Sequence, residues 1–156
     1  MRLYHGSTID IAKVDLALSK PNKDFGRAFY LSDDRQQALE MAQFRAEFEE
    51  TEPVVNIYEF EETLFQEFRY KRFEAYTEEW AHFVYDHRTE PHGRTLHNYD
   101  IVYGPIANDR VGVQIGKYEA GDITLDQFLE NLQYMKGVTF QYFFGTESAL
   151  AKLSKI

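Results

Sequence analysis

Apolar and polar residues alternate or recur along this chain in patterns that predict short strands mixed with amphipathic helices. Apolar runs rich in aromatic and β-branched residues favour strands, whereas apolar residues spaced three and four apart favour helices. The pattern leaves residues 61–71 unassigned. It predicts strands at 1–5, 27–32, 54–60, 99–103, 111–115 and 138–144, and helices at 35–49, 77–88, from Thr124 to Gly137, and from Thr146 to Leu153.

Polar residues mark where the expected helices begin. Asp33 and Asp34 are followed three positions later by Gln36 and Gln37, and Thr124 is followed by Gln127, which are spacings of a capping box. In the first helix we expect a wide buried face made of Leu39, Ala42 and Ala46, with Met41, Phe44 and Phe48 alongside.

The order of these elements indicates an α+β fold, because strands and helices do not alternate regularly as they do in a doubly wound sheet. The 156 residues fit one domain, 1–156, which can bury roughly two-thirds of the surface of the unfolded chain. Residues 6–8 are expected to turn out of the first strand.

Charge and composition narrow the classes of partner. The chain carries 26 Asp+Glu against 17 Lys+Arg and no basic run, which disfavours extended nucleic-acid binding. With no Cys it has no disulfide, zinc-thiolate site or thiol nucleophile. The acidic residues gather at 47–62 and 74–79, where a solvated surface is expected and a basic partner is the alternative. We find no signal peptide and no membrane-spanning stretch, so we expect a cytoplasmic protein without a membrane partner.

Candidate chemistry lies in the first 32 residues. His5 ends a strand and precedes Gly6, whose missing side chain would let its backbone approach a ligand closely. Tyr30 could stack on a flat cationic ring, where cation–π attraction contributes roughly 0.5 to 2 kcal/mol. Ser7 and Ser32 add hydroxyls. The set suits a nucleotide with a cationic ring, although a strand-end His taken alone is more often a structural hydrogen-bonder and a strand Tyr taken alone is usually a core residue.

Other polar residues could support such a ligand. Arg27 and its cationic neighbours lie beside the opening motifs, where a compact anion would need donors. Asn108 could either position a ligand or close a turn through its side chain. The histidines at 87, 92 and 97 are expected to be surface residues of a loop, and we expect no metal site.

Four segments, in order and spacing, resemble a bacterial domain family of unknown function. They are YHGS at 4–7, DFGRAFYLS at 24–32, YDIVYGPIANDRV at 99–111 and QYFFGTESAL at 141–150. That family is similar to the diphtheria-toxin and poly(ADP-ribose) polymerase branch of ADP-ribosyltransferases. The resemblance implies split antiparallel sheets flanked by helices, NAD as co-substrate, and toxin-like transfer of ADP-ribose to a macromolecular acceptor with release of nicotinamide.

Enzymes of that branch use a His, a Tyr and usually a Glu on three strands. By resemblance, His5 anchors a ribose, the Gly6 backbone pairs with the nicotinamide amide, and Tyr30 stacks on the ring. Gln141 stands where the last catalytic strand begins and is the expected third residue. Glu147 is the alternative because it supplies a carboxylate, although it would also suit the start of a helix as a dipole partner.

An amide at the third position costs electrostatic stabilisation, because positive charge builds up on the ribose carbon as the nicotinamide bond breaks. Another carboxylate could serve instead, and the candidates are Asp100, Asp109, Glu147 and, less favourably, Asp24. Two rival functions therefore stay open. One is a non-catalytic module that binds NAD or ADP-ribose. The other is a protein-interaction domain that uses its acidic face, such as one half of a toxin–antitoxin pair with an antitoxin protein as partner.

Overall fold

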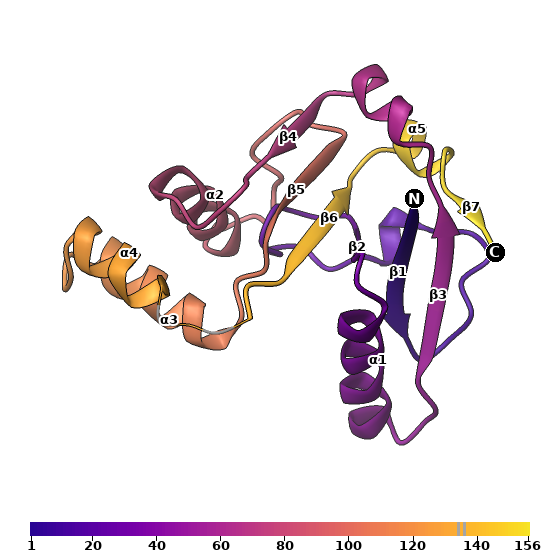
Figure 1. The fold of residues 1–156 in the computed structure, drawn as a ribbon, viewed down its shortest axis with the longest axis horizontal. Coiled ribbons are helices and arrows are strands. Elements are labelled where there is room, and N and C mark those ends of the chain that lie inside the picture. Colours follow the sequence, from indigo (N-terminus) through magenta and orange to yellow (C-terminus); the bar gives the residue numbers. More distant parts are fainter. Residues whose placement is uncertain (134, 136) are drawn as a thin grey trace.

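The chain folds into two mostly antiparallel sheets flanked by helices, an α+β architecture (Figure 1). The computed structural model describes residues 1–133, 135 and 137–156. Within those ranges no helix is both long enough and apolar enough to cross a membrane. The elements are β1 (Arg2–Ser7), a 3-10 turn (Leu16–Leu18), β2 (Phe29–Leu31), α1 (Arg35–Glu49), β3 (Val54–Glu59), a 3-10 turn (Glu62–Glu67), β4 (Tyr70–Arg72), α2 (Glu78–Arg88), β5 (Ile101–Pro105), α3 (Asp109–Glu119), α4 (Leu125–Gln133), β6 (Phe140–Phe144), α5 (Glu147–Leu150) and β7 (Ser154–Lys155).

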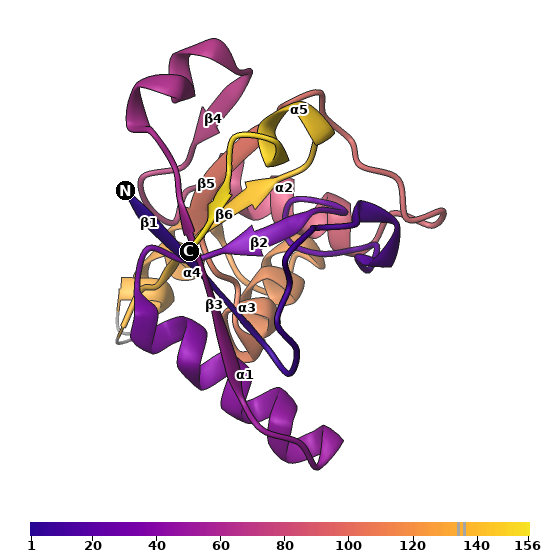
Figure 2. The ribbon, with the colours of Figure 1, turned by 90° about the vertical axis from the view of Figure 1, so that its right-hand side faces the viewer.

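The two sheets meet at a single bridge. One sheet has the strand order β1-β3-β7 and the other β2-β6-β5-β4, in which the β4–β5 pair is parallel. Tyr4 in β1 and Ser32, just after β2, exchange two backbone hydrogen bonds of 2.7 and 2.8 Å. The sheets diverge from this point, and α1 lies along β1 and β3 on one side of it (Figures 1 and 2).

Apolar side chains form one core on each side of the four-stranded sheet, because successive residues of a strand point to opposite faces. Phe143 and Val102 face α2, α3 and α4, where Trp80 and Phe128 are fully buried. The other face packs on the three-stranded sheet. Its fully or almost fully buried residues include Leu3, Leu31, Tyr58, Phe60, Ile101, Tyr142 and Phe144.

The prediction for the buried face of α1 is wrong for its large side chains. Met41, Phe44 and Phe48 are 46%, 71% and 87% exposed, and we call them the α1 stripe. The buried residues are Ala38, Ala42 and Ala46. A Cβ on Gly6 would lie 2.1 Å from the Ala38 carbonyl oxygen, so the helix approaches β1 too closely for anything larger than alanine.

The predicted strand at 111–115 is also wrong, because these residues belong to α3. Asn108 caps that helix by accepting a hydrogen bond of 2.9 Å from the Val111 N–H. Val111 and Ile115 are buried on the same side, four residues apart, whereas Val113 is exposed. The β-branched residues favoured a strand, but the burial pattern follows the helical period.

Other boundaries differ by a few residues. Residues 6 and 7 continue β1 instead of turning out of it. The predicted closing helix is present and begins after Thr146, but it ends at Leu150 and not at Leu153, and β7 follows. The unassigned stretch supplies β4. The capping predictions are confirmed at Asp34, which accepts from Gln36 N, and at Thr124, which exchanges hydrogen bonds with Gln127. The predicted extension of α4 to Gly137 lies partly outside the described residues.

Candidate functional site

The backbone of β1 and β2 stops pairing directly after the Tyr4–Ser32 bridge. In an antiparallel ladder the hydrogen-bonded pairs recur at every second residue, so Gly6 and Tyr30 would form the next pair. The Tyr30 carbonyl instead meets His5 Nδ1 at 2.6 Å. The N–H and C=O of Gly6 therefore face β2 without bonding to it. We call this place, between Gly6 and Tyr30, the β1–β2 split.

The His5 imidazole is held in one tautomer. A carbonyl oxygen only accepts hydrogen bonds, so Nδ1 carries the proton that is donated to Tyr30, and Nε2 keeps its lone pair. Burial lowers the pKa of His5, which keeps the ring neutral at pH 7. The ring packs on Phe29, with 4.2 Å between the ring centroids. Nε2 is thus available to accept a hydrogen bond from a hydroxyl.

The Tyr30 ring is fixed from both ends. Its hydroxyl donates to the Gly26 carbonyl at 2.7 Å and accepts from the Phe25 N–H at 2.9 Å. The ring also meets Phe143 edge-on, 5.9 Å between centroids. Burial raises the pKa of Tyr30 well above its usual value, so the phenol stays protonated. Tyr30 therefore ties the loop at 24–26 to β2 and is partly exposed beside the split.

The structure brings Gln141, and not Glu147, to this region. Leu31 pairs with Tyr142 in the β2–β6 register, so Gln141 lies opposite Ser32, on the same face as Tyr30. Glu147 is exposed in the first turn of α5, beyond the other end of β6. From Gln141 to Phe144 the strand alone spans about 10 Å at roughly 3.3 Å per residue, and Glu147 follows beyond Gly145 and Thr146, so the two side chains lie toward opposite ends of β6.

The other predicted ligand residues have local partners. Ser32 and Ser7 are buried, and their hydroxyls accept from the Asp34 and Ile9 N–H groups. Arg27 is exposed and its guanidinium donates to the Ser19 carbonyl. Asn108 is exposed at the start of α3. Of these, Ser32 lies next to the split, whereas Arg27 and Asn108 hold loops further from it.

Among the other candidate carboxylates, Asp24 is the one that contacts this region. Its buried carboxylate accepts hydrogen bonds from the Arg88 side chain, the Ala107 N–H and the Gln141 amide. Asp100 binds Arg69 near Gly145, and Asp109 is exposed on α3. Sequence reasoning missed Arg88 altogether, because no local pattern links residues 64 positions apart.

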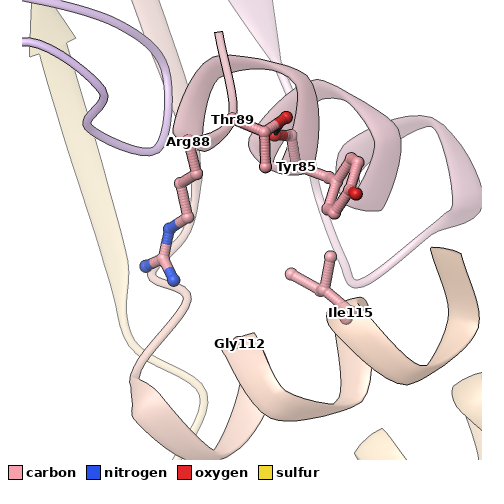
Figure 3. Close-up of a pocket in the computed structure, with 6 residues that line it drawn as sticks. Tyr85, Arg88, Thr89, Gly112 and Ile115 are labelled. Atoms are coloured by element: carbon pink, nitrogen blue, oxygen red, sulfur yellow. Dashed lines mark hydrogen bonds between the residues drawn. The ribbon is translucent and has the colours of Figure 1, made fainter. Parts of the chain in front are cut away.

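Arg88 also borders a hollow between α2 and α3 (Figure 3). Its guanidinium reaches toward Gly112, where an added Cβ would lie 2.9 Å from Nη1, so a side chain at this position would push the guanidinium aside. The hollow measures about 190 Å³ and is lined by Tyr85, Arg88, Thr89, Gly112, Ile115 and Gly116. A second, apolar hollow of about 350 Å³ lies beside α4. His5, Tyr30 and Gln141 line neither hollow.

Two histidines expected at the surface are packed together instead, so that prediction is wrong. His87 is 2% exposed, and its ring lies 5.3 Å from that of His97. His87 donates to the Phe83 carbonyl and accepts from Leu96 N–H. His97 likewise binds Phe25 O and Tyr99 N. Within the described ranges, no three His, Cys, Asp or Glu side chains form a group that could hold a metal ion.

Comparison with family models identifies the family of this chain. A family model described as "Protein of unknown function (DUF3990)" matches residues 1–154. No curated protein and no solved structure matches the chain. Because the family model covers nearly all of the sequence, this chain belongs to the DUF3990 family of proteins of unknown function.

Proposed function

We propose that this chain is an NAD-dependent ADP-ribosyltransferase, toxin-like in character, that moves ADP-ribose from NAD to a macromolecular acceptor and releases nicotinamide. The observation that carries the proposal is the β1–β2 split. There the N–H and C=O of Gly6 form an adjacent donor and acceptor that β2 does not use. A carboxamide presents the complementary acceptor and donor, so the amide of nicotinamide can pair with both.

The residues around the split support the same ligand. His5 Nε2 is an acceptor for a ribose hydroxyl, since Nδ1 is bound to Tyr30. The Tyr30 ring is immobilised by two hydrogen bonds and offers a fixed aromatic wall for a cationic ring. Gln141 lies on the face of β2 and β6 that carries Tyr30, whereas the His5 ring packs on Phe29, which points to the other face. Gln141 would orient the 2′-hydroxyl. Two diverging sheets flanked by helices are also the arrangement that the resemblance to ADP-ribosyltransferases implies.

The reaction breaks the bond between C1′ of the nicotinamide ribose and the ring nitrogen. The electron pair of this bond leaves with the ring, which becomes neutral nicotinamide. A nucleophilic atom of the acceptor supplies the pair for the new bond to C1′ and loses its proton to water. Positive charge on the sugar peaks between these events, so oriented acceptors near C1′ and the 2′-hydroxyl lower the barrier.

A second candidate is a module that binds NAD or ADP-ribose without cleaving it. The observation that favours it is the state of Asp24, the nearest carboxylate, whose two oxygens already accept from Arg88, Ala107 and Gln141. A third candidate is an interaction domain for an antitoxin. The exposed α1 stripe favours it, because apolar residues on a free helix face commonly mark protein contacts.

Incubation of the purified chain with NAD separates the three. Release of nicotinamide, followed by chromatography, supports the transferase. Saturable binding of NAD without release supports the module. If the chain neither cleaves nor binds NAD, the interaction domain is supported. Within the first outcome, Gln141→Ala is expected to abolish release, whereas Glu147→Ala leaves it intact. The reverse pattern would show that Glu147 is the third residue.

A further inference from the structure

The Asp24 carboxylate is the centre of a buried hydrogen-bond cluster that joins four segments of the chain. It is 8% exposed. Oδ1 accepts from Arg88 Nε at 2.8 Å and lies 2.7 Å from Arg88 Nη2. Oδ2 accepts from the Ala107 N–H at 3.0 Å and from Gln141 Nε2 at 2.9 Å. Each carboxylate oxygen therefore has two donors, and the charge is held in place from several sides.

This cluster decides which way the Gln141 amide faces. An ionised carboxylate accepts hydrogen bonds and cannot donate them, so the atom of Gln141 next to Asp24 must be the NH₂ group. The oxygen Oε1 then points away from Asp24. In the part of the chain that the structure describes, Gln141 Oε1 makes no hydrogen bond. The cluster thus presents one free amide oxygen on the face shared with Tyr30 and Ser32.

We propose that Asp24 is a positioning residue that orients the Gln141 amide, so that Gln141 Oε1 accepts the hydrogen bond of a sugar hydroxyl bound at the β1–β2 split. This proposal rests on the proposed function, since the sugar is the nicotinamide ribose of NAD. Asp24 does not touch the substrate. It acts through Gln141. Arg88 and the Ala107 N–H donate hydrogen bonds that hold the Asp24 carboxylate in place.

The pair also compensates for the absence of a carboxylate at position 141. Hydrogen bonds in a chain polarise one another, so a negative charge behind the NH₂ group makes the amide oxygen a stronger acceptor. The Arg88 guanidinium offsets part of this charge, because it contacts the opposite oxygen of Asp24. The net effect is a dipole aimed at the place where positive charge develops on the ribose, which is the kind of preorganised group that stabilises a transition state.

The test is an exchange of the two groups. In Asp24→Asn the carboxylate is lost, the NH₂ group of Gln141 is no longer fixed, and kcat for nicotinamide release should fall about 10- to 100-fold with KM for NAD changed less than about threefold. In the double variant D24N/Q141E the amide and carboxylate trade places, and a carboxylate now faces the sugar. This variant should recover kcat to at least the wild-type value.

The single variant Q141E gives a pH readout that a purely structural role would not produce. Two carboxylates then share one hydrogen-bonding site, so one of them binds a proton more tightly. The pH–rate profile of Q141E should gain a transition in the range where that proton leaves, and D24N/Q141E should lack it. Glu90→Gln is the matched control, because Glu90 is a carboxylate that is likewise only 7% exposed and binds an Arg, Arg94, but takes no part in the Asp24 cluster. It should lower the unfolding midpoint without changing kcat.

The outcomes separate the positioning role of Asp24 from the transferase activity itself. Wild-type release of nicotinamide together with unchanged kcat in D24N would overturn the positioning role and leave the transferase standing. A double variant no more active than D24N, with both folded by circular dichroism, would also overturn it. No release by the wild-type chain would overturn the proposed function and, with it, the role of Asp24.

Discussion

His5 Nδ1 lies 2.6 Å from the backbone oxygen of Tyr30, in the position that the Gly6 N–H would occupy if β1 and β2 paired continuously. A side chain thus substitutes for a rung of the ladder and holds the two sheets apart. The same contact fixes the tautomer of the imidazole. The side chain that keeps β1 and β2 from pairing therefore also provides a hydrogen-bond acceptor, His5 Nε2, beside the split.

Two substitutions at His5 separate these effects. His5→Asn keeps an NH₂ group close to the position of Nδ1, so the free energy of unfolding should fall by less than about 1 kcal/mol. His5→Ala leaves the Tyr30 carbonyl unpaired and should cost about 1–3 kcal/mol. Both remove Nε2, so both should abolish nicotinamide release if the proposed function holds. Urea unfolding and product chromatography provide the two measurements, and release at the wild-type rate by His5→Asn would exclude Nε2 as the ribose anchor.

Gly6→Ala should destabilise the fold by about 1–3 kcal/mol or more, because the new methyl group would lie 2.1 Å from the Ala38 carbonyl oxygen and α1 would have to move. Gly116→Ala is the control. It lies in α3 with no atom within 4 Å of the added carbon, and a helical alanine should add about 0.5–1 kcal/mol. Equal urea midpoints for the two variants would contradict the close contact of α1 with β1.

Tyr30→Phe should lower the free energy of unfolding by about 1–3 kcal/mol, since the Phe25 N–H and the Gly26 carbonyl lose their partner inside the protein. The same substitution at Tyr118 is the control. Its hydroxyl donates to Glu78 at the surface, where water replaces the bond, so Tyr118→Phe should change stability by no more than about 0.5 kcal/mol. Thermal unfolding of both variants distinguishes a buried hydroxyl from an exposed one.

Stability should fall as the pH drops below about 6.5, the ordinary pKa of histidine. Burial lowers the pKa of His5, His87 and His97 in the folded chain, so the unfolded chain binds more protons in this range. The stability is complete above pH 6.5 and is lost between that value and the folded-state pKa values, by at most about 1.4 kcal/mol per pH unit for each group. His97→Gln should reduce the slope of the free energy of unfolding against pH by the contribution of one histidine. Urea midpoints at several pH values measure this slope. An unchanged slope would show that His97 is not among the groups responsible.

The α1 stripe should be replaceable without loss of the fold. The double variant F44E/F48E should change the free energy of unfolding by no more than about 0.5 kcal/mol per site, because both rings face solvent. Ala42→Leu, on the buried side of the same helix, should cost about 1–3 kcal/mol through overpacking. Chemical denaturation measures both. A loss above about 2 kcal/mol in F44E/F48E would place the stripe in a packed core.

The sequence predicts what depends on neighbours and misses what depends on distant contacts. The caps at Asp34 and Thr124 are local and are confirmed. The α1 face was wrong because helical periodicity says which residues share a side, whereas the space available on that side depends on Gly6 in another element. At 111–115, β-branched residues favoured a strand, whereas in the structure Val111 and Ile115 pack from a helix into the core shared with α2 and α4.

The candidate site divides in the same way. His5, Gly6 and Tyr30 could be singled out because each lies in a short motif, and the β2–β6 register places Gln141 on the same face as Tyr30. Arg88 could not be found, since its role exists only through a buried carboxylate from another part of the chain. Whether these residues act on NAD stays a prediction.

The Asp24 cluster has a consequence for folding kinetics. Its hydrogen bonds close loops of 64, 83 and 117 residues, so the cluster cannot form before most of the chain has reached its native topology. No collapsed intermediate should therefore carry an oriented Gln141 amide. On refolding from urea, any activity should return only in the slowest cooperative phase. The last change in the intrinsic fluorescence of Trp80 should occur in the same phase.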